Sequence, residues 1–151
     1  MWNFKGKELS DDQIPDKAIG FIYRITQISN GKQYLGKKLL TKSATKSVKG
    51  VKKKIRVESD WRDYWSSSPA LLDYITSHGL DDFTKEILVF CSSKGSLLYC
   101  EELALYAVGA LESDQWWNSN IRSKVYRSWV RPTEAKELRE TLSYHSSSGS
   151  S

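Results

Sequence analysis

Residues 19–39 restrict the choice of fold more than any other part of the chain. Over 19–25, Ile19, Phe21, Tyr23 and Ile25 occupy every second position, which is the period of a β-strand. Asn30-Gly31 then provides the preferred sequence for a type I′ turn, because both central residues of that turn take positive φ. A second strand over 33–39 should therefore pair back antiparallel to the first.

The turn also predicts which side chains share a face of this hairpin. With a two-residue loop at Asn30-Gly31, Tyr23 lies opposite Lys38. Strict alternation then places Tyr34 and Gly36 on the same face as these two residues. Two phenols and an ammonium group would share one surface. Paired tyrosines are also common as cross-strand packing, so alternation alone leaves a structural and a chemical role open.

The remaining pattern predicts one small α+β domain. A chain of 151 residues can bury one hydrophobic core, but it is short for two. Residues 1–17 are mostly polar and are expected to form an N-terminal arm. We expect a small central antiparallel sheet of three strands, starting with the hairpin and flanked by helices. Its further elements are a helix with Ser68 as cap, Pro69 in its first turn and Gly79 at its end, a strand over 83–90 and a helix over 96–111.

The C-terminal part and the cysteines carry weaker signals. Segment 126–145 is expected to be helical within 134–142, and 146–151 has the Ser/Gly composition of a flexible tail. Cys91 and Cys100 have no neighbouring ligands in a zinc-binding spacing, so neither a zinc site nor a disulfide framework is expected. No apolar run approaches the roughly 20 residues of a membrane span. A cytoplasmic protein is expected.

Positive charge is concentrated in one segment. The net charge is +5, and residues 37–56 hold nine Lys or Arg and no acid. A solvated loop explains this composition, and so does a surface that attracts phosphates. We expect the basic insertion, 37–57, to be a loop or partly helical. Its candidate DNA-binding residues are Lys37, Lys42, Lys46, Lys49, Lys52, Lys53, Lys54 and Arg56.

Glu101 falls where a carboxylate needs a partner. On a helical wheel over 96–111 it lies in the middle of the apolar face, between Leu97 and Leu105, whereas Glu102 lies at the margin. A charged carboxylate left alone there would be strongly unfavourable, so it should be paired, protonated or bound to a cation. A Lys or Arg of the basic segment is one candidate partner. A hard divalent ion, Mg²⁺ or Mn²⁺, is the other.

The hairpin resembles the signature of the GIY-YIG nuclease superfamily. Gly20-Phe21-Ile22-Tyr23 and, after ten residues, Tyr34-Leu35-Gly36 are similar to its two triplets. Phe21 stands at the glycine position of the first triplet, and Leu35 replaces isoleucine in the second. The resemblance, which is to small phage-encoded members, covers roughly residues 18–125 and extends to 59–64, Ser67-Ser68, His78-Gly79 and 83–88.

This resemblance implies a metal-dependent DNA endonuclease that hydrolyses phosphodiester bonds. It implies Tyr23 as the general base, and Tyr34 as the group that orients water or phosphate. It also implies one Mg²⁺ or Mn²⁺ ion at Glu101. Lys38 would favour the Tyr23 phenolate, because nearby positive charge favours loss of a phenolic proton.

The same resemblance implies an asparagine and an arginine in the site. Asn118, after Trp116-Trp117, is similar to the family's asparagine, with Asn120 as a nearby alternative. The family's Arg, followed by His or Tyr, is assigned to Arg62 with Tyr64, and Arg56 is the fallback.

Two other functions stay open from the sequence. The chain could be a non-catalytic nucleic-acid-binding module that uses segment 37–56, or an interaction protein whose basic loop contacts an acidic partner. A nuclease of this size has no room for a large recognition domain. Specificity would then come from the insertion, from segment 122–145 or from a homodimer. A freestanding phage-type enzyme of the bacterial cytoplasm, in homing, restriction or DNA degradation, is the expectation.

Overall fold

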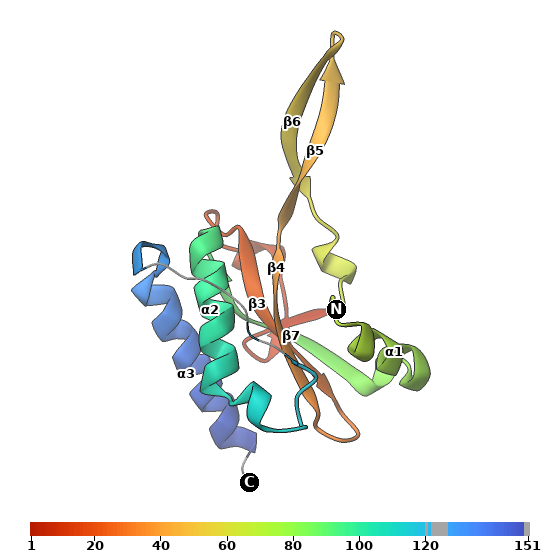
Figure 1. Ribbon diagram of the computed structural model, residues 1–151, viewed down its shortest axis with the longest axis vertical. Helices are drawn as coiled ribbons and strands as arrows, with labels where there is room; N and C mark the ends of the chain where they lie inside the picture. Colours follow the sequence, from red (N-terminus) through yellow and green to blue (C-terminus); the bar gives the residue numbers. More distant parts are fainter. Residues whose placement is uncertain (120, 122–126, 150–151) are drawn as a thin grey trace.

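The computed structural model describes residues 1–119, 121 and 127–149, with 144–149 described by their backbone. Within these residues, a five-stranded mixed sheet has the order β2-β1-β7-β3-β4 (Figure 1). The antiparallel core β7-β3-β4 confirms the predicted α+β class, but the sheet is larger than three strands. The strands are β1 (Trp2–Phe4), β2 (Lys7–Glu8), β3 (Gly20–Gln27), β4 (Gln33–Leu39) and β7 (Phe83–Cys91).

The N-terminal residues belong to the sheet, so the prediction of an arm over 1–17 does not hold. β1 pairs parallel with β7, with Trp2 opposite Lys85 and Phe4 opposite Ile87. Both aromatic rings are buried in the core, and Trp2 Nε1 donates to the carbonyl of Trp61 at 2.6 Å. Burial of two large aromatic side chains offsets the entropy lost by ordering a short segment.

Helices cover both faces of the sheet (Figure 1). α2 (Lys94–Ala107) and α3 (Pro132–Gly149) lie on the face that carries Ile22 and Leu35. α1 (Pro69–His78) lies on the opposite face, with Phe21 and Tyr23. Short 3-10 turns connect these elements at η1 (Asp11–Gln13), η2 (Trp61–Asp63), η3 (Leu80–Asp82), η4 (Ala110–Glu112) and η5 (Arg127–Trp129).

The ends of the helices follow local chemistry. Ser68 caps α1 by accepting from Leu71 N, and Gly79 ends it at φ 84°, as predicted. α2 stops before residue 111, because Gly109 takes the left-handed conformation at φ 63°. α3 continues through Gly149, so 146–149 extend the helix, where a tail was predicted. Extending a formed helix costs less than starting one.

The β3–β4 connection is longer than the predicted type I′ turn. Thr26 pairs with Gln33, and of the two turn residues only Gly31 takes positive φ, at 73°. Asp82 holds the loop, because its backbone and side-chain oxygens accept from the amides of Ile28 and Ser29. The register therefore shifts by two residues from the predicted one, which keeps the predicted side chains on the same face.

The basic insertion is a β-hairpin, so the prediction of a loop or partial helix was wrong. β5 (Thr41–Val48) pairs antiparallel with β6 (Val51–Glu58). The turn residues Lys49 and Gly50 both have positive φ, 52° and 78°, which is the geometry expected at Asn30-Gly31. The hairpin extends beyond the end of β4, away from the sheet (Figure 1).

None of the helices in the described part of the chain combines the length and the apolar composition that a membrane span needs.

Candidate functional site

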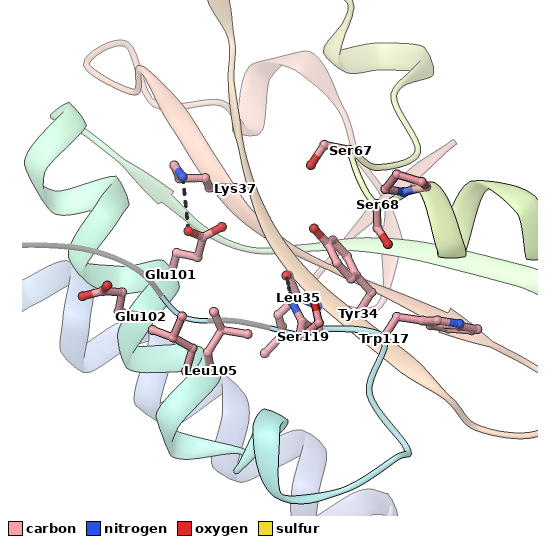
Figure 2. Close-up of a pocket in the computed structure, with 13 residues that line it drawn as sticks. Tyr34, Leu35, Lys37, Ser67, Ser68, Glu101, Glu102, Leu105, Trp117 and Ser119 are labelled. Atoms are coloured by element: carbon pink, nitrogen blue, oxygen red, sulfur yellow. Dashed lines mark hydrogen bonds and ion pairs between the residues drawn. The ribbon is translucent and has the colours of Figure 1, made fainter.

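A pocket of about 370 Å³ lies beside β4, where both faces of the sheet meet its edge. Figure 2 shows Tyr34 on one side of the strand and the pair of Lys37 and Glu101 on the other. The N-terminus of α1 contributes Ser67 and Ser68. The remaining described lining residues are Leu35, Pro69, Glu102, Leu105, Trp117, Asn118, Ser119 and Ile121.

The edge of β4 is partly covered by the segment that follows η4. Trp117 N donates to the carbonyl of Gln33 at 2.9 Å. The Asn118 side chain accepts from Leu35 N at 3.0 Å and donates to Leu35 O at 2.7 Å, so it replaces a neighbouring strand at this position. Asn118 lines the pocket, and its side-chain amide is engaged in holding β4. Asn120, the alternative, lies outside the described residues.

The two tyrosines of the hairpin lie on one face, as the alternation predicted. Tyr23 pairs with Gly36, and the ring centroids of Tyr23 and Tyr34 are 6.1 Å apart. A methyl group at Gly36 would come within 2.5 Å of Tyr23 Cζ, so only glycine leaves room for the ring. On the other side of β3, the register shifts between Ile22 and Tyr23, a bulge of the kind found beside active sites.

Tyr23 does not suit the predicted role of general base. Its side chain is 1% exposed, and it is not among the described residues that line the pocket. Burial raises the pKa of Tyr23 well above its ordinary value of 10, and the neighbouring Tyr34 and Tyr64 raise it further. Tyr34, in contrast, lines the pocket. The two phenols lie together, but only Tyr34 is placed to meet a substrate there.

Glu101 reaches the pocket from α2. Its Oε1 lies 3.2 Å from Lys37 Nζ, and its side chain is 21% exposed. The sequence left a lysine of the basic segment and a divalent ion as alternative partners, and Lys37 is the partner seen here. Lys37 was predicted only as a DNA-binding residue. Alternation could have assigned it to this site, since it points with Leu35 toward the face that α2 covers.

The oxygen-rich lining suits a hard cation that keeps several waters. The described residues contain no group of three or more His, Cys, Asp or Glu side chains that could hold a metal ion. The pocket offers instead the carboxylates of Glu101 and Glu102 with the hydroxyls of Tyr34 and Ser67. Mg²⁺ is commonly bound through one or two carboxylates, with water and substrate phosphate completing its shell. A positive charge, the Lys37 ammonium, already lies against Glu101.

Lys38 and Tyr64 lie next to the tyrosine pair. The Tyr64 ring meets the edge of Tyr23 at 6.0 Å, and Lys38 Nζ lies 4.0 Å from the Tyr64 ring centroid. Lys38 is also paired with Asp60 at 2.6 Å, and this contact lowers the pKa of that carboxyl group. Lys38 is thus engaged with Tyr64 and Asp60. These contacts do not support the predicted role of Lys38 in favouring a Tyr23 phenolate.

The candidate arginines lie away from the pocket. Arg62 donates to both carboxylate oxygens of Asp11, at 3.0 and 2.9 Å, and to Glu58 at 2.9 Å. Arg56, on β6, donates to the hydroxyls of Thr41 and Ser43. Neither arginine is among the described lining residues, so the prediction that one of them serves this pocket is not supported. Among the described lining residues, the basic side chain is that of Lys37.

Lys85 was not singled out from the sequence. It lies on β7, is 2% exposed, and donates to the carbonyls of Arg62 and Tyr64 at 3.1 and 3.0 Å. Its ammonium lies 4.5 Å from the ring centroid of Trp2 and 4.6 Å from that of Trp65. Lys85 therefore anchors the segment that places Tyr64 against Tyr23. A lone lysine in a strand pattern gives no signal for this role.

Burial of Lys85 should make stability depend on pH. Burial lowers the pKa of Lys85 from 10.5 to about 8. Between these values the unfolded chain holds the proton and the folded chain releases it, so the free energy of unfolding should rise with pH. We expect a rise of about 2 kcal/mol between pH 8 and 9.5, measured by urea titration. The variant Lys85→Met should lack it, and an identical rise in that variant would assign the effect elsewhere.

The chain matches the profile of a known protein family. The profile described as "Putative endonuclease segE, GIY-YIG domain" matches residues 2–121. No curated protein and no solved structure matches the chain. The matched range contains both tyrosines, Glu101, Asn118 and the whole β5–β6 hairpin.

Proposed function

Since the chain belongs to the SegE-type GIY-YIG endonuclease family and is thus a phosphodiester hydrolase, we propose that the pocket beside β4 is its active site. The proposal rests on one observation. A single pocket at the edge strand β4 is lined by Tyr34 on one side of the strand and by the pair of Lys37 and Glu101 on the other. A phosphodiester placed there would meet a phenol, an ammonium group and a carboxylate at once.

Each of these side chains has a task in hydrolysis. Glu101, with Glu102 beside it, would hold one Mg²⁺ or Mn²⁺ ion. When bound, that ion supplies positive charge that polarises a phosphoryl oxygen and stabilises the leaving oxygen. Lys37 can pair with a phosphate oxygen as it pairs with Glu101 here. Tyr34 would orient the attacking water and, in its phenolate form, accept the proton that the water loses.

Other residues position this site without contacting the substrate. Tyr23 packs behind Tyr34 across Gly36, and Asn118 fixes the β4 backbone at Leu35. Lys38 and Tyr64 close the cluster around Tyr23. In this proposal the pocket uses Lys37 where other members of the family use an arginine.

The family makes DNA the substrate class, and we assign its electrostatic attraction to the basic hairpin. The enzyme would act as a freestanding phage-type nuclease in the bacterial cytoplasm, in homing or DNA degradation. Cutting both strands would take a second copy of the chain or a second binding event. Within the basic segment 37–56, we assign this role to Lys37, Lys42, Lys46 and Lys53.

A plasmid-nicking assay tests the proposal. Supercoiled DNA should be converted to nicked and linear forms with Mg²⁺ or Mn²⁺, and EDTA should stop the reaction. If the protein retards DNA in a gel but leaves it intact with either metal, even at large molar excess, the chain is a binding module and the proposed activity fails.

A further inference from the structure

The β5–β6 hairpin has two chemically different faces. Pairing of Lys46 with Lys53 and of Val48 with Val51 fixes the register, and side chains alternate between the faces. We call one the lysine-valine face; it includes Lys42, Lys46, Val48, Val51, Lys53 and Ile55. We call the other the hydroxyl face; it includes Ser43, Thr45, Ser47, Lys52, Lys54 and Arg56.

Like charges lie directly opposite one another on the lysine-valine face. Lys46 faces Lys53 across the ladder, an arrangement that destabilises a strand pair. The hairpin stands apart from the main sheet, so little packing offsets this repulsion. A polyanion bound to both ammonium groups would turn the repulsion into attraction. The pairing thus indicates a ligand with closely spaced negative charges.

The hydroxyl face has no directly opposed pair of like charges. Each of its basic residues faces a hydroxyl: Lys52 faces Ser47, Lys54 faces Thr45 and Arg56 faces Ser43. The Arg56 guanidinium also donates to Thr41, at 2.8 Å to its hydroxyl and 2.9 Å to its carbonyl. The base of this face carries an acid, since Thr41 lies opposite Glu58. The hydroxyl face therefore lacks the cross-strand repulsion that a bound anion would relieve.

Lys42 of the lysine-valine face lies at the base of the hairpin, next to the proposed active site. A second pocket, of about 310 Å³, lies at the base of the hairpin and is lined by Lys37, Lys38, Thr41 and Lys42. Lys37 belongs to both pockets. A basic track therefore runs from the active site through Lys42 to Lys46 and Lys53.

We propose that the lysine-valine face lies in the major groove of duplex DNA beside the cut site; this rests on the proposed function. Each strand has eight residues, so the hairpin is about 26 Å long. A two-stranded ribbon fits a groove about 12 Å wide. Val48 and Val51, 41% and 57% exposed, would reach thymine methyl groups, while Lys46 and Lys53 neutralise phosphates.

Two charge-matched double variants test the face assignment. DNA affinity is measured against salt concentration, with EDTA present, on a duplex. Lys46→Gln with Lys53→Gln should flatten the slope of log affinity against log salt by about 1.8, because two phosphate contacts are lost. Lys52→Gln with Lys54→Gln removes the same charge from the hydroxyl face and should leave the slope unchanged. Removing the repulsive pair should leave the melting temperature equal to or above that of the wild type.

Each other outcome overturns the assignment. If both double variants flatten the salt slope equally, DNA responds only to the total charge of the hairpin and not to one face. If neither variant changes the slope, the hairpin does not contact the DNA. The nuclease proposal is scored separately, by nicking of plasmid DNA by the wild-type protein in Mg²⁺ at low salt. If the salt slopes of the two double variants are as expected but the wild-type protein cuts no DNA, the proposed nuclease activity fails and the assignment of the hairpin face to the groove stands.

Discussion

The variant Tyr34→Phe should nick DNA about 10²- to 10⁴-fold more slowly than the wild type, the usual loss when a proton acceptor is removed. Tyr34 lines the pocket, and its hydroxyl is the part that the substitution deletes. The same change at Tyr23 should act mainly on stability, at about 0.5–1.5 kcal/mol, because its hydroxyl is buried and bonded within the protein. Single-turnover nicking with enzyme in excess separates the two effects.

Tyr23→Phe is thus the matched control, since it removes the same atom from the neighbouring ring. Unfolding by urea checks that both variants remain folded under assay conditions. A larger loss of nicking rate in Tyr23→Phe than in Tyr34→Phe would restore the roles that the sequence predicted. The burial of Tyr23 would then have to be relieved when DNA binds.

The variant Glu101→Gln should lose metal-dependent nicking by about 10³-fold, equivalent to about 4 kcal/mol of transition-state stabilisation. The amide keeps the shape of the side chain but removes the negative charge that attracts a divalent ion. Folding should change little, because a partly exposed ion pair such as that of Glu101 with Lys37 contributes about 0–1 kcal/mol. The rate is measured over a series of Mg²⁺ concentrations, where residual activity should need far more metal.

Glu140→Gln on α3 is the control, since it removes an equal charge from an exposed helix position. Nicking by Glu101→Gln at the wild-type rate and metal concentration would remove Glu101 from the site. A loss confined to Glu102→Gln would move the cation to the neighbouring carboxylate, and the helical face assignment would fail with it.

The shared face of the two tyrosines could be predicted because strand alternation is local. The register itself was wrong by two residues, yet an even shift leaves every side chain on its face. The loop length depends on Asp82, 53 residues beyond Ser29, and no local rule contains that contact. The hairpin with its turn at Lys49-Gly50 could not be predicted either. The basic, polar composition of its two strands is equally typical of a solvated loop.

The candidate site was predictable in part for the same reason. Helical periodicity showed that Glu101 needs a partner, and one was found in Lys37. The position of Arg62 was not predictable, because it is decided by Asp11, from a segment that was expected to be a free arm. Burial of Tyr23 likewise depends on Trp2, which joins the core only when β1 pairs with β7.

A double substitution at Tyr34 and Glu101 measures whether the phenol and the carboxylate act on the same phosphate group. Residues that act as a unit give strongly non-additive losses. The single-turnover nicking rate of Tyr34→Phe combined with Glu101→Gln should lie within about threefold of the slower single variant. If the two losses multiply in full, Tyr34 and Glu101 work independently, and the pocket beside β4 is not a single catalytic centre.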